Sequence, residues 1–368
     1  MLWQWCPKAC VGLVGSTWQS VARSSGPILA AAMCTAGFIC GVYHAYHLYQ
    51  AKKRKEYVDS LPEEWVQVGY VKGLNAYPVK SCTGVPLNNA ECSPLGLRDD
   101  FIRDRILMVV TAEDNVVIRF KAYPELIRIK PTFKKSILTL KHPKMQPIVI
   151  DLKKVKAKEK TTRATISSAC VPVYDCGDEV NEWITKCLDD KDTKFRLVYY
   201  ASENSRERAG DVTRWPNIYD VLRPTDTGAF ADEVTYHVLN EASVDDLNFR
   251  LKSRGKELQV DETRFRANIY VSGCKPFDED NWKYVKIGEN VFQVIKPCIR
   301  CIATVVNPET GVRDKSLEPL ETLRSYRQAT DPDVRKEAGN APLMGIHMAL
   351  RSEPGGIISL NNPIYVAY

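Results

Sequence analysis

The chain has 368 residues, enough for an N-terminal segment and two modest domains. Its formal net charge is +6, but residues 1–55 contain six basic side chains and no acidic one, so the rest of the chain holds 45 basic against 45 acidic residues. This balance argues against a nucleic-acid-binding protein, which needs a clear basic excess. Twelve cysteines without regular spacing in a chain of this length indicate reduced thiols in the cytosol rather than a disulfide framework.

The first 49 residues divide into two segments. Residues 1–27 lack acidic residues and carry several serines, a composition typical of a mitochondrial targeting segment. Residues 28–49 contain no Asp, Glu, Lys or Arg, and at ~1.5 Å per helical residue they span roughly 33 Å, enough to cross a bilayer core. This run is too long, and begins too far into the chain, for a cleaved secretory signal. The basic cluster Lys52–Lys55 follows directly, so the positive-inside rule predicts an anchor in the mitochondrial outer membrane with the large domain facing the cytosol.

Residues 64–201 are expected to form a domain built mainly from short strands. Residues 66–71 alternate between apolar and polar side chains, as a half-buried strand does. Further apolar runs predict strands at residues 105–111, 116–120, 136–140, 148–152 and 195–200. A helix is predicted at residues 178–188, where apolar side chains recur at helical spacing.

The second half of the chain is again rich in predicted strands. Residues 202–227 are polar and are expected to connect the two domains or to form a long loop over the active site. A helix is predicted to begin at Ser243, in a capping-box-like sequence, and to end near Gly255. Strands are predicted at residues 235–239, 268–272, 284–287, 291–295, 345–349 and 357–360. We therefore expect a β-rich α+β protein with two barrel-like lobes, residues 64–201 and 228–368, after an N-terminal transmembrane helix.

The residues best suited to bind a metal or take part in a reaction are Cys298 and Cys301, which lie three positions apart with Arg300 between them. A thiolate is a soft metal ligand, and an adjacent cation favours its formation. Apolar runs at 291–295 and 302–306 place the pair in a bend between two predicted strands. A structural zinc site would need a second closely spaced ligand pair, which the sequence does not offer, and a thioredoxin-type dithiol would open a helix. Spacing alone leaves two interpretations open: reduced cysteines without a special role, or one thiolate that binds a metal cofactor.

Five short motifs occur in order between residue 64 and the C-terminus. They are Tyr77-Pro-Val-Lys-Ser81, Gly96-Leu-Arg98 with Arg103-Asp-Arg105, Phe265-Arg-Ala-Asn-Ile269, Cys298-Ile-Arg-Cys301 and Leu323-Arg-Ser-Tyr-Arg327. In this order they resemble the mitochondrial amidoxime-reducing component, a family of molybdenum enzymes of the MOSC superfamily. The resemblance implies the family's two lobes, a MOSC N-terminal β-barrel domain followed by a MOSC domain.

The resemblance also implies a site for the molybdenum–molybdopterin cofactor. Cys301 corresponds to the family's molybdenum ligand and would be the catalytic residue. Guanidinium forks and amide groups suit phosphate and pterin edges, and the implied cofactor-binding residues are Lys80, Ser81, Arg105, Arg266, Asn268 and Arg300. Cys298 is expected to pack beside this site or to support it without binding the metal.

Three departures from the family pattern bear on this site. The chain has Asp232-Glu233-Val234 where family members usually carry small hydroxyl residues, which leaves one cofactor contact without its usual residue. Phe-Arg-Ala-Asn replaces Phe-Arg-Pro-Asn, and Ile299 replaces a small polar residue between the cysteines. None of the three removes the metal ligand.

The function that the resemblance implies is reduction of N-hydroxylated compounds, such as amidoximes and hydroxylamines, to amidines and amines. Electrons would come from cytochrome b5 and its NADH-dependent reductase, and the chain has no G-x-G-x-x-G motif with which to bind a nicotinamide itself. The alternative is a MOSC protein that carries or handles the cofactor or its sulfur without turnover. Residues 130–160 hold ten lysines against Asp151 and Glu159. This segment is a candidate docking surface for an acidic cytochrome b5, with anionic lipid headgroups or a plain solvated face as the alternatives.

Overall fold

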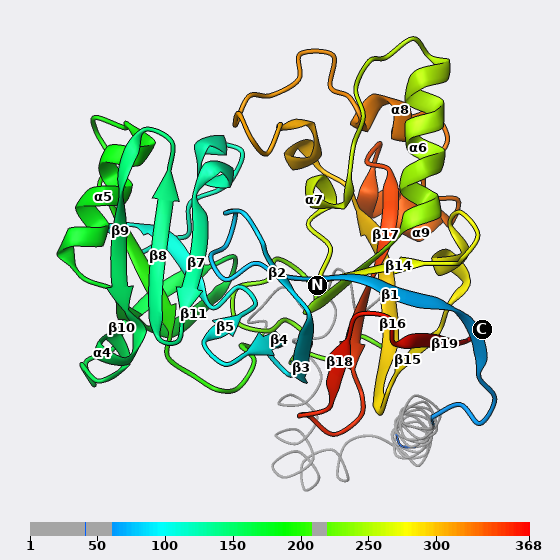
Figure 1. The fold of residues 1–368 in the computed structure, drawn as a ribbon, viewed down its shortest axis with the longest axis horizontal. Helices are drawn as coiled ribbons and strands as arrows, with labels where there is room; N and C mark the ends of the chain where they lie inside the picture. Colours follow the sequence, from blue (N-terminus) through cyan, green and yellow to red (C-terminus); the bar gives the residue numbers. More distant parts are fainter. Residues whose placement is uncertain (1–40, 42–60, 208–218) are drawn as a thin grey trace, which may run out of the picture. The chain divides into compact units, whose positions relative to one another are not determined.

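The computed structural model describes residue 41, residues 61–207 and residues 219–368 (Figure 1). Residues 62–368 form one compact unit. The expected targeting segment, residues 1–27, and all but residue 41 of the expected anchor, residues 28–49, lie outside the described residues. In the ranges that are described, no helix has both the length and the apolar character needed to cross a membrane.

A closed barrel of seven strands holds residues from both halves of the chain. Its strands are β1 (Val66–Ala76), β13 (Tyr236–Asn240), β14 (Ile269–Ser272), β15 (Tyr284–Ile287), β16 (Asn290–Ile299), β17 (Leu343–Leu350) and β19 (Pro363–Ala367). They follow the order β14–β13–β17–β16–β15–β19–β1, and the pairing of β1 with β14 closes the ring. Neighbouring strands are antiparallel except β13 and β14, which are parallel. The barrel, most of whose strands come from the second half of the chain, is therefore closed by β1 from the first half. The domain limits given from the sequence, residues 64–201 and 228–368, remain a prediction.

Strand alternation gives the barrel wall two different faces. Tyr236 and Met348 are register partners and are buried in the barrel interior. His237 and His347 are also partners, and they lie on the outer face because successive side chains of a strand point to opposite sides. Val221 and Leu222 of the connecting segment, together with Val234 after it, pack against Ala349 on this outer face. The outer face of β13 and β17 is thus covered, and it carries two histidines among apolar side chains.

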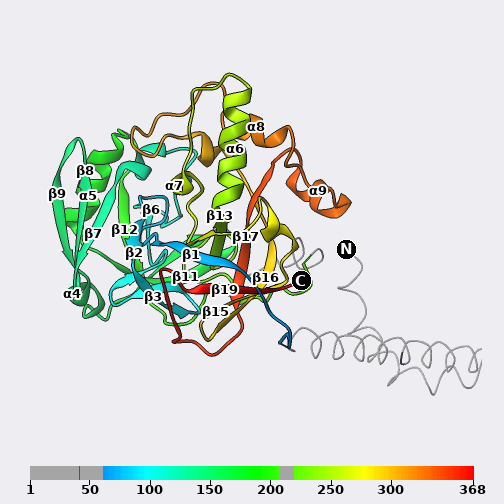
Figure 2. The same ribbon diagram turned by 45° about the vertical axis from the view of Figure 1, so that its right-hand side comes forward.

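The first half of the chain adds an open lobe of two sheets. One sheet has the order β10 (Thr162–Ile166), β11 (Ala169–Asp175), β12 (Phe195–Tyr200) and β6 (Leu107–Thr111), and the other has the order β7 (Lys130–Lys134), β8 (Ile137–His142) and β9 (Met145–Asp151). Helix α5 (Asp178–Leu188) packs against both β12 and β9, so the two sheets and this helix enclose one apolar core (Figures 1 and 2).

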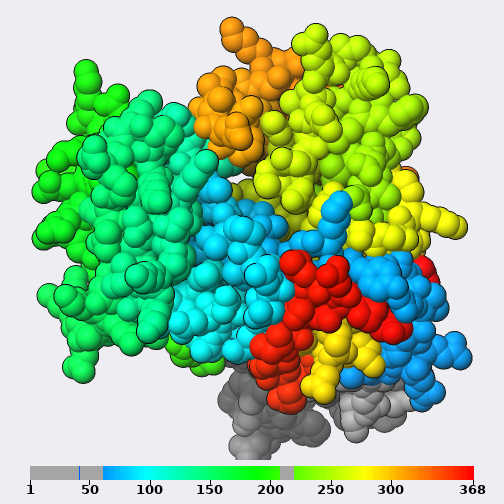
Figure 3. Space-filling model, viewed as in Figure 1, coloured from blue at the N-terminus to red at the C-terminus, as the bar shows by residue number. Residues whose placement is uncertain are grey.

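A small sheet joins residues that are distant in the sequence. It has the order β18 (Ile357–Ser359), β3 (Asn89–Ser93), β4 (Gly96–Asp99) and β5 (Ile102–Arg103), while β2 (Val85–Leu87) extends the barrel sheet beside β1. Figure 3 shows this cyan part of the chain between the green open lobe and the red and yellow barrel strands. The remaining helices are η1 (Pro124–Arg128), α4 (Leu152–Lys156), α6 (Glu241–Ser253), α7 (Glu262–Phe265), η2 (Asp278–Asn281), η3 (Ile302–Val305), α8 (Leu320–Arg324) and α9 (Pro332–Ala338).

Three of the sequence predictions are wrong in detail. Residues 116–120 form only isolated bridges at Val116 and Val117 rather than a strand. Residues 302–305 form the 3-10 helix η3, so Cys301 precedes a helix turn and does not lie between two strands. The helix predicted from Ser243 begins at Glu241, because the Asn240 side chain accepts the capping hydrogen bond from Ala242. By contrast, α5 and β12 have the predicted bounds.

Ser243 has a different partner from the one a capping box requires. Its hydroxyl donates to the carboxylate of Glu279 at 2.9 Å, and the Asn240 amide donates to the same group at 3.0 Å. Glu279 is fully buried, and this burial raises its pKa from 4.5 to about 7. The folded state therefore holds a proton on Glu279 over a pH range in which the unfolded chain has released it.

This proton makes stability depend on pH. Because the folded-state pKa is raised, the free energy of unfolding should fall as pH rises from about 4.5 to 7, by up to about 3 kcal/mol. Glu279→Gln keeps the hydrogen-bonding shape without the charge and should be more stable than wild type at pH 8 but not at pH 4.5. Urea unfolding at both pH values measures this, with the exposed Glu289→Gln as control. An unchanged pH slope in Glu279→Gln would contradict the assignment.

Candidate active site

Two arginines enclose the ring of Tyr77 at the junction of the barrel and the open lobe. The guanidinium carbon of Arg105 lies 4.9 Å from the ring centroid, and that of Arg266 lies 4.3 Å from it. Arg105 also donates to the Asn268 side-chain oxygen at 3.2 Å. These residues come from three motifs, which the fold brings together because β1 pairs with β14.

The backbone at this site adopts an uncommon conformation. Ser81, Arg105 and Arg266 have φ values of 71°, 46° and 59°, in the left-handed region that non-glycine residues rarely enter. Such strain concentrates at functional sites, where the surrounding structure enforces it. Arg266 reaches this conformation as the residue that ends α7.

Asp104 holds this cluster together, although it is not among the site residues predicted from the sequence. Its side chain is 1% exposed and accepts hydrogen bonds from the Tyr77 backbone N–H at 2.8 Å and from the Asn268 amide at 2.9 Å. It also pairs with Arg105 at 2.5 Å. The sequence signal that could have indicated it is an acid between two arginines directly before an apolar strand.

Lys80 belongs to the same region and contacts the residues just before β13. Its ammonium group donates to the Phe230 carbonyl at 2.9 Å and pairs with Asp232 at 2.5 Å. Burial lowers the pKa of Lys80, and the Asp232 carboxylate opposes this shift. Asp232 begins the Asp232-Glu233-Val234 sequence that replaces the family's small hydroxyl residues. It is therefore the ion-pair partner of a predicted cofactor-binding lysine.

The two cysteines of the motif differ in environment. Cys298 is buried at the end of β16, whereas Cys301 is exposed and precedes η3. Arg300 between them is buried, and it donates to the Cys298 sulfur and to the Phe265 carbonyl, each at 2.8 Å. Because Phe265 adjoins Arg266, this contact places the cysteine motif beside the arginine cluster.

Similarity to known proteins identifies the family. Residues 68–191 match the MOSC N-terminal β-barrel domain and residues 225–365 match the MOSC domain. The mitochondrial amidoxime-reducing component 1 of Homo sapiens is 37% identical over 300 residues, covering 82% of this chain and 83% of that protein. The component 1 of Xenopus laevis is 32% identical over 358 residues, covering 97% of this chain and 96% of that protein. The chain belongs to the amidoxime-reducing component family.

Solved structures add little to this result. The YuaD protein of Bacillus subtilis covers 83% of this chain and 98% of its own, at 10% identity and a TM-score of 0.32. The YiiM protein of Geobacillus stearothermophilus covers 36% of this chain and 54% of its own, at 14% identity and a TM-score of 0.22. TM-scores this low support no inference about fold or function.

The charge of the site fits the anionic cofactor expected in an amidoxime-reducing component. Lys80, Arg105, Arg266 and Arg300 are four cations, and the carboxylates bonded to them are those of Asp104 and Asp232. Burial is the main cause that lowers the pKa of Arg266, and repulsion from Arg105 is the second, as expected for a cation that lacks a compensating charge.

One buried donor in this site also lacks an acceptor. The Nε atom of Arg300 is buried and has no hydrogen-bond partner in the part of the chain that the structure describes. A buried unpaired donor is costly, so an acceptor on a bound molecule would be favourable here. Both observations fit a phosphate-bearing pterin held near Cys301.

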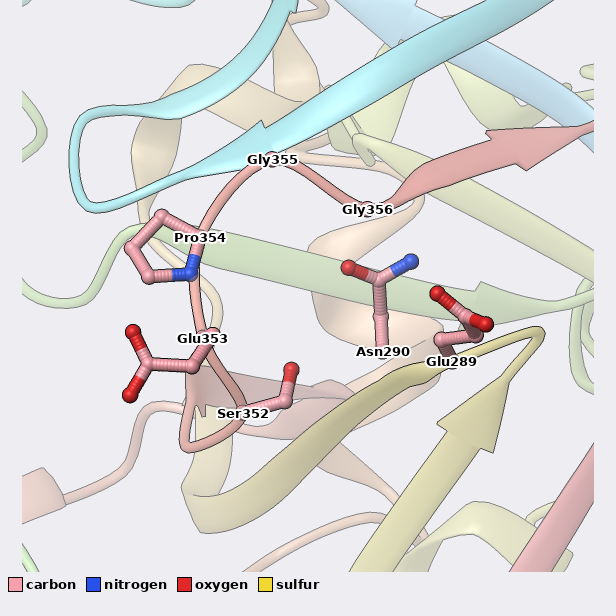
Figure 4. A pocket seen from close by; sticks show the side chains of 7 residues that line it. All are labelled: Glu289, Asn290, Ser352, Glu353, Pro354, Gly355 and Gly356. Atoms are coloured by element: carbon pink, nitrogen blue, oxygen red, sulfur yellow. The ribbon is translucent and has the colours of Figure 1, made fainter.

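A metal site built from protein side chains alone would need several ligands arranged around one ion. The residues described contain no group of three or more His, Cys, Asp or Glu side chains arranged to hold a metal ion. A cavity of about 390 Å³ lies between the β15–β16 turn and residues 352–356, and two glutamates line it. Figure 4 shows the Glu289 and Glu353 carboxylates on opposite sides of Asn290, so they do not converge on a common ion.

Proposed function

We propose that this chain is a molybdenum-cofactor-dependent reductase of N-hydroxylated compounds. The observation that carries the proposal is the cluster of Arg105, Arg266 and Arg300, the last of which directly precedes Cys301 in the chain, in a protein 37% identical to a named amidoxime-reducing component. Three cations and a thiol of this kind suit an anionic cofactor whose metal takes one soft protein ligand. The alternative is a MOSC protein that carries or handles the cofactor without turnover.

The residues have distinct roles in this proposal. Cys301 would ligate molybdenum as a thiolate. Lys80, Ser81, Arg105, Arg266, Asn268 and Arg300 would bind and orient the pterin and its phosphate. When bound, the cofactor supplies a metal that accepts the substrate's oxygen and passes on two electrons. The overall reaction consumes two electrons and two protons, converts an N–OH group to N–H and releases water.

Reconstitution tests the proposal directly. The purified full-length protein, loaded with cofactor, should convert benzamidoxime to benzamidine when supplied with NADH, cytochrome b5 and cytochrome b5 reductase. Omitting cytochrome b5 should stop turnover, because the chain has no nicotinamide-binding motif. A protein that holds one equivalent each of cofactor and molybdenum but forms no benzamidine would favour the carrier alternative.

We also propose that cytochrome b5 docks on a lysine-rich surface of the open lobe. This surface consists of ten exposed lysines at positions 130, 134, 135, 141, 144, 153, 154, 156, 158 and 160. Lys130 and Lys141 are register partners on β7 and β8, and like charges directly opposite one another destabilise a sheet. An acidic partner would offset this repulsion.

Charge reversal on this surface should slow electron transfer. Changing Lys153, Lys154, Lys156 and Lys158 to Glu is expected to reduce the rate of association with reduced cytochrome b5 by about tenfold or more and to flatten its dependence on salt. Stopped-flow kinetics at several ionic strengths measure both. The control reverses four exposed lysines of the other half, Lys252, Lys275, Lys283 and Lys336. An unchanged salt dependence in the first variant, or an equal effect in the control, would exclude this docking surface.

We propose further that the protein is anchored in the mitochondrial outer membrane with residues 62–368 in the cytosol. The support is the acid-free segment 1–55 with its basic cluster and the names of the relatives, which are mitochondrial components. Protease added to intact mitochondria should then remove the large domain while matrix proteins survive. If the domain survives until the outer membrane is ruptured, the proposed orientation is wrong.

A further inference from the structure

Cys298 differs from the other buried thiols among the described residues. It is 6% exposed, Arg300 donates to its sulfur at 2.8 Å, and the imidazole of His347 is a second polar group against it. Burial alone would raise the pKa of this thiol, but the charge of Arg300 and the interaction with His347 lower it to about 6. Burial raises the pKa of Cys82 and of Cys92 to about 12. The surroundings of Cys298 therefore favour a negative charge where an ordinary buried cysteine is neutral.

Three elements supply the groups around this sulfur. His347 comes from β17, and its Nε2 atom lies 3.7 Å from the carboxylate of Glu233, just before β13. Glu233 is ion-paired with Lys296 of β16, which is the register partner of His347. Burial, with repulsion from Lys296, lowers the pKa of His347 to about 4, so its imidazole is neutral at pH 7. The charge hydrogen-bonded to the sulfur is therefore that of Arg300.

The guanidinium of Arg300 is fixed on two of its nitrogens. One terminal nitrogen donates to Cys298 and lies 3.5 Å from Nε2 of His237, whose pKa burial and Arg300 hold well below its usual value. The other donates to the carbonyl of Phe265. The buried Nε atom is left without an acceptor among the described residues.

We propose that Cys298 is a positioning residue whose thiolate holds the Arg300 guanidinium so that its Nε donor stays available to the cofactor beside Cys301. The thiolate rests on the 2.8 Å hydrogen bond from Arg300 and on the lowered pKa of Cys298, whereas the positioning role rests on the proposed function. A packing cysteine would instead be neutral and replaceable by alanine.

The protonation state can be measured at the peptide level. Trypsin cleaves after Lys286 and Arg300 but not between Lys296 and Pro297, so Cys298 and Cys301 fall in separate peptides. Alkylation by iodoacetamide at a series of pH values should give Cys298 a half-maximal rate near pH 6, with the rate falling below it. Cys82 and Cys92, which share another peptide, should stay unreacted at pH 7. Arg300→Gln should move the pH midpoint of Cys298 alkylation upward by roughly one to three pH units; this variant lacks the tryptic site after residue 300, so the alkylated cysteine is located by fragmentation of the joined peptide. A wild-type midpoint above about 8.5, the value of a free thiol, would overturn the thiolate assignment.

Restoring the negative charge tests the positioning role. Cys298→Ser removes the anion and should lower both the bound pterin and the turnover of benzamidoxime about tenfold or more, the size of one charged hydrogen bond. Cys298→Asp restores an anion next to Arg300 and should recover much of both. A packing role predicts the opposite order, because a buried carboxylate is tolerated worse than a hydroxyl.

If wild type binds pterin without turnover, the proposed enzyme function fails, and the order of pterin content among the variants still decides whether Cys298 positions Arg300. An aspartate variant no better than serine in pterin content would overturn the proposal.

Discussion

Replacing Cys301 by alanine is expected to abolish N-reduction while the protein still folds. Cys301 is exposed, so its removal creates no cavity in the core. The variant would lose the proposed thiolate ligand of the metal, whereas the proposed pterin-binding residues Lys80, Arg105, Arg266 and Asn268 would remain. We therefore expect molybdenum content and benzamidoxime reduction to fall to background and bound pterin to persist in part.

The controls for this variant separate the competing interpretations of the motif. Cys170→Ala removes an exposed cysteine of the open lobe and should leave activity unchanged. Cys298→Ala should reduce turnover only in part, because this thiol supports Arg300 without binding the metal. A zinc site or a redox dithiol would use both sulfurs jointly, so equal and complete loss in Cys298→Ala and Cys301→Ala, or zinc in place of molybdenum, would refute the assignment.

Replacing Asp104 by asparagine is expected to have the largest effect on stability. Its buried carboxylate pairs with Arg105 and accepts hydrogen bonds from the Tyr77 backbone N–H and the Asn268 amide. Loss of one partner of a buried ion pair leaves the other charge uncompensated, which typically costs about 3–5 kcal/mol. The variant should also lose bound pterin, because Arg105 and Asn268 would no longer be fixed.

Urea unfolding followed by tryptophan fluorescence measures the change in free energy. Asp99→Asn is the matched control, since Asp99 is exposed at the end of β4 close by in the sequence. It should change the free energy of unfolding by less than about 0.5 kcal/mol. A similarly small effect for Asp104→Asn would show that the carboxylate is not the organising group of the site.

Much of the site could be identified from the sequence because its residues stand in short motifs. Arg105, Arg266 and Asn268 were predicted as cofactor contacts, and the structure places them together around Tyr77. Whether they bind the cofactor remains a prediction. The histidines at 237 and 347 carried no signal, since each is a single polar residue in an apolar strand. Their meeting depends on the register of β13 with β17.

Local patterns determined some elements of the fold, and long-range pairing determined the rest. Helix α5 follows from apolar side chains at helical spacing, and β12 follows from a continuous apolar run, so both were predicted with their observed bounds. Residues 302–305 are as apolar as a strand but form η3, because no neighbouring strand is available to pair with them in the described residues. Barrel closure by β1 and β14, and the bond between Cys298 and Arg300 beside His347, were decided only by tertiary structure. The physical reason is that a sequence pattern records which side chains become buried, whereas strand partners and charge neighbours depend on residues far away in the chain.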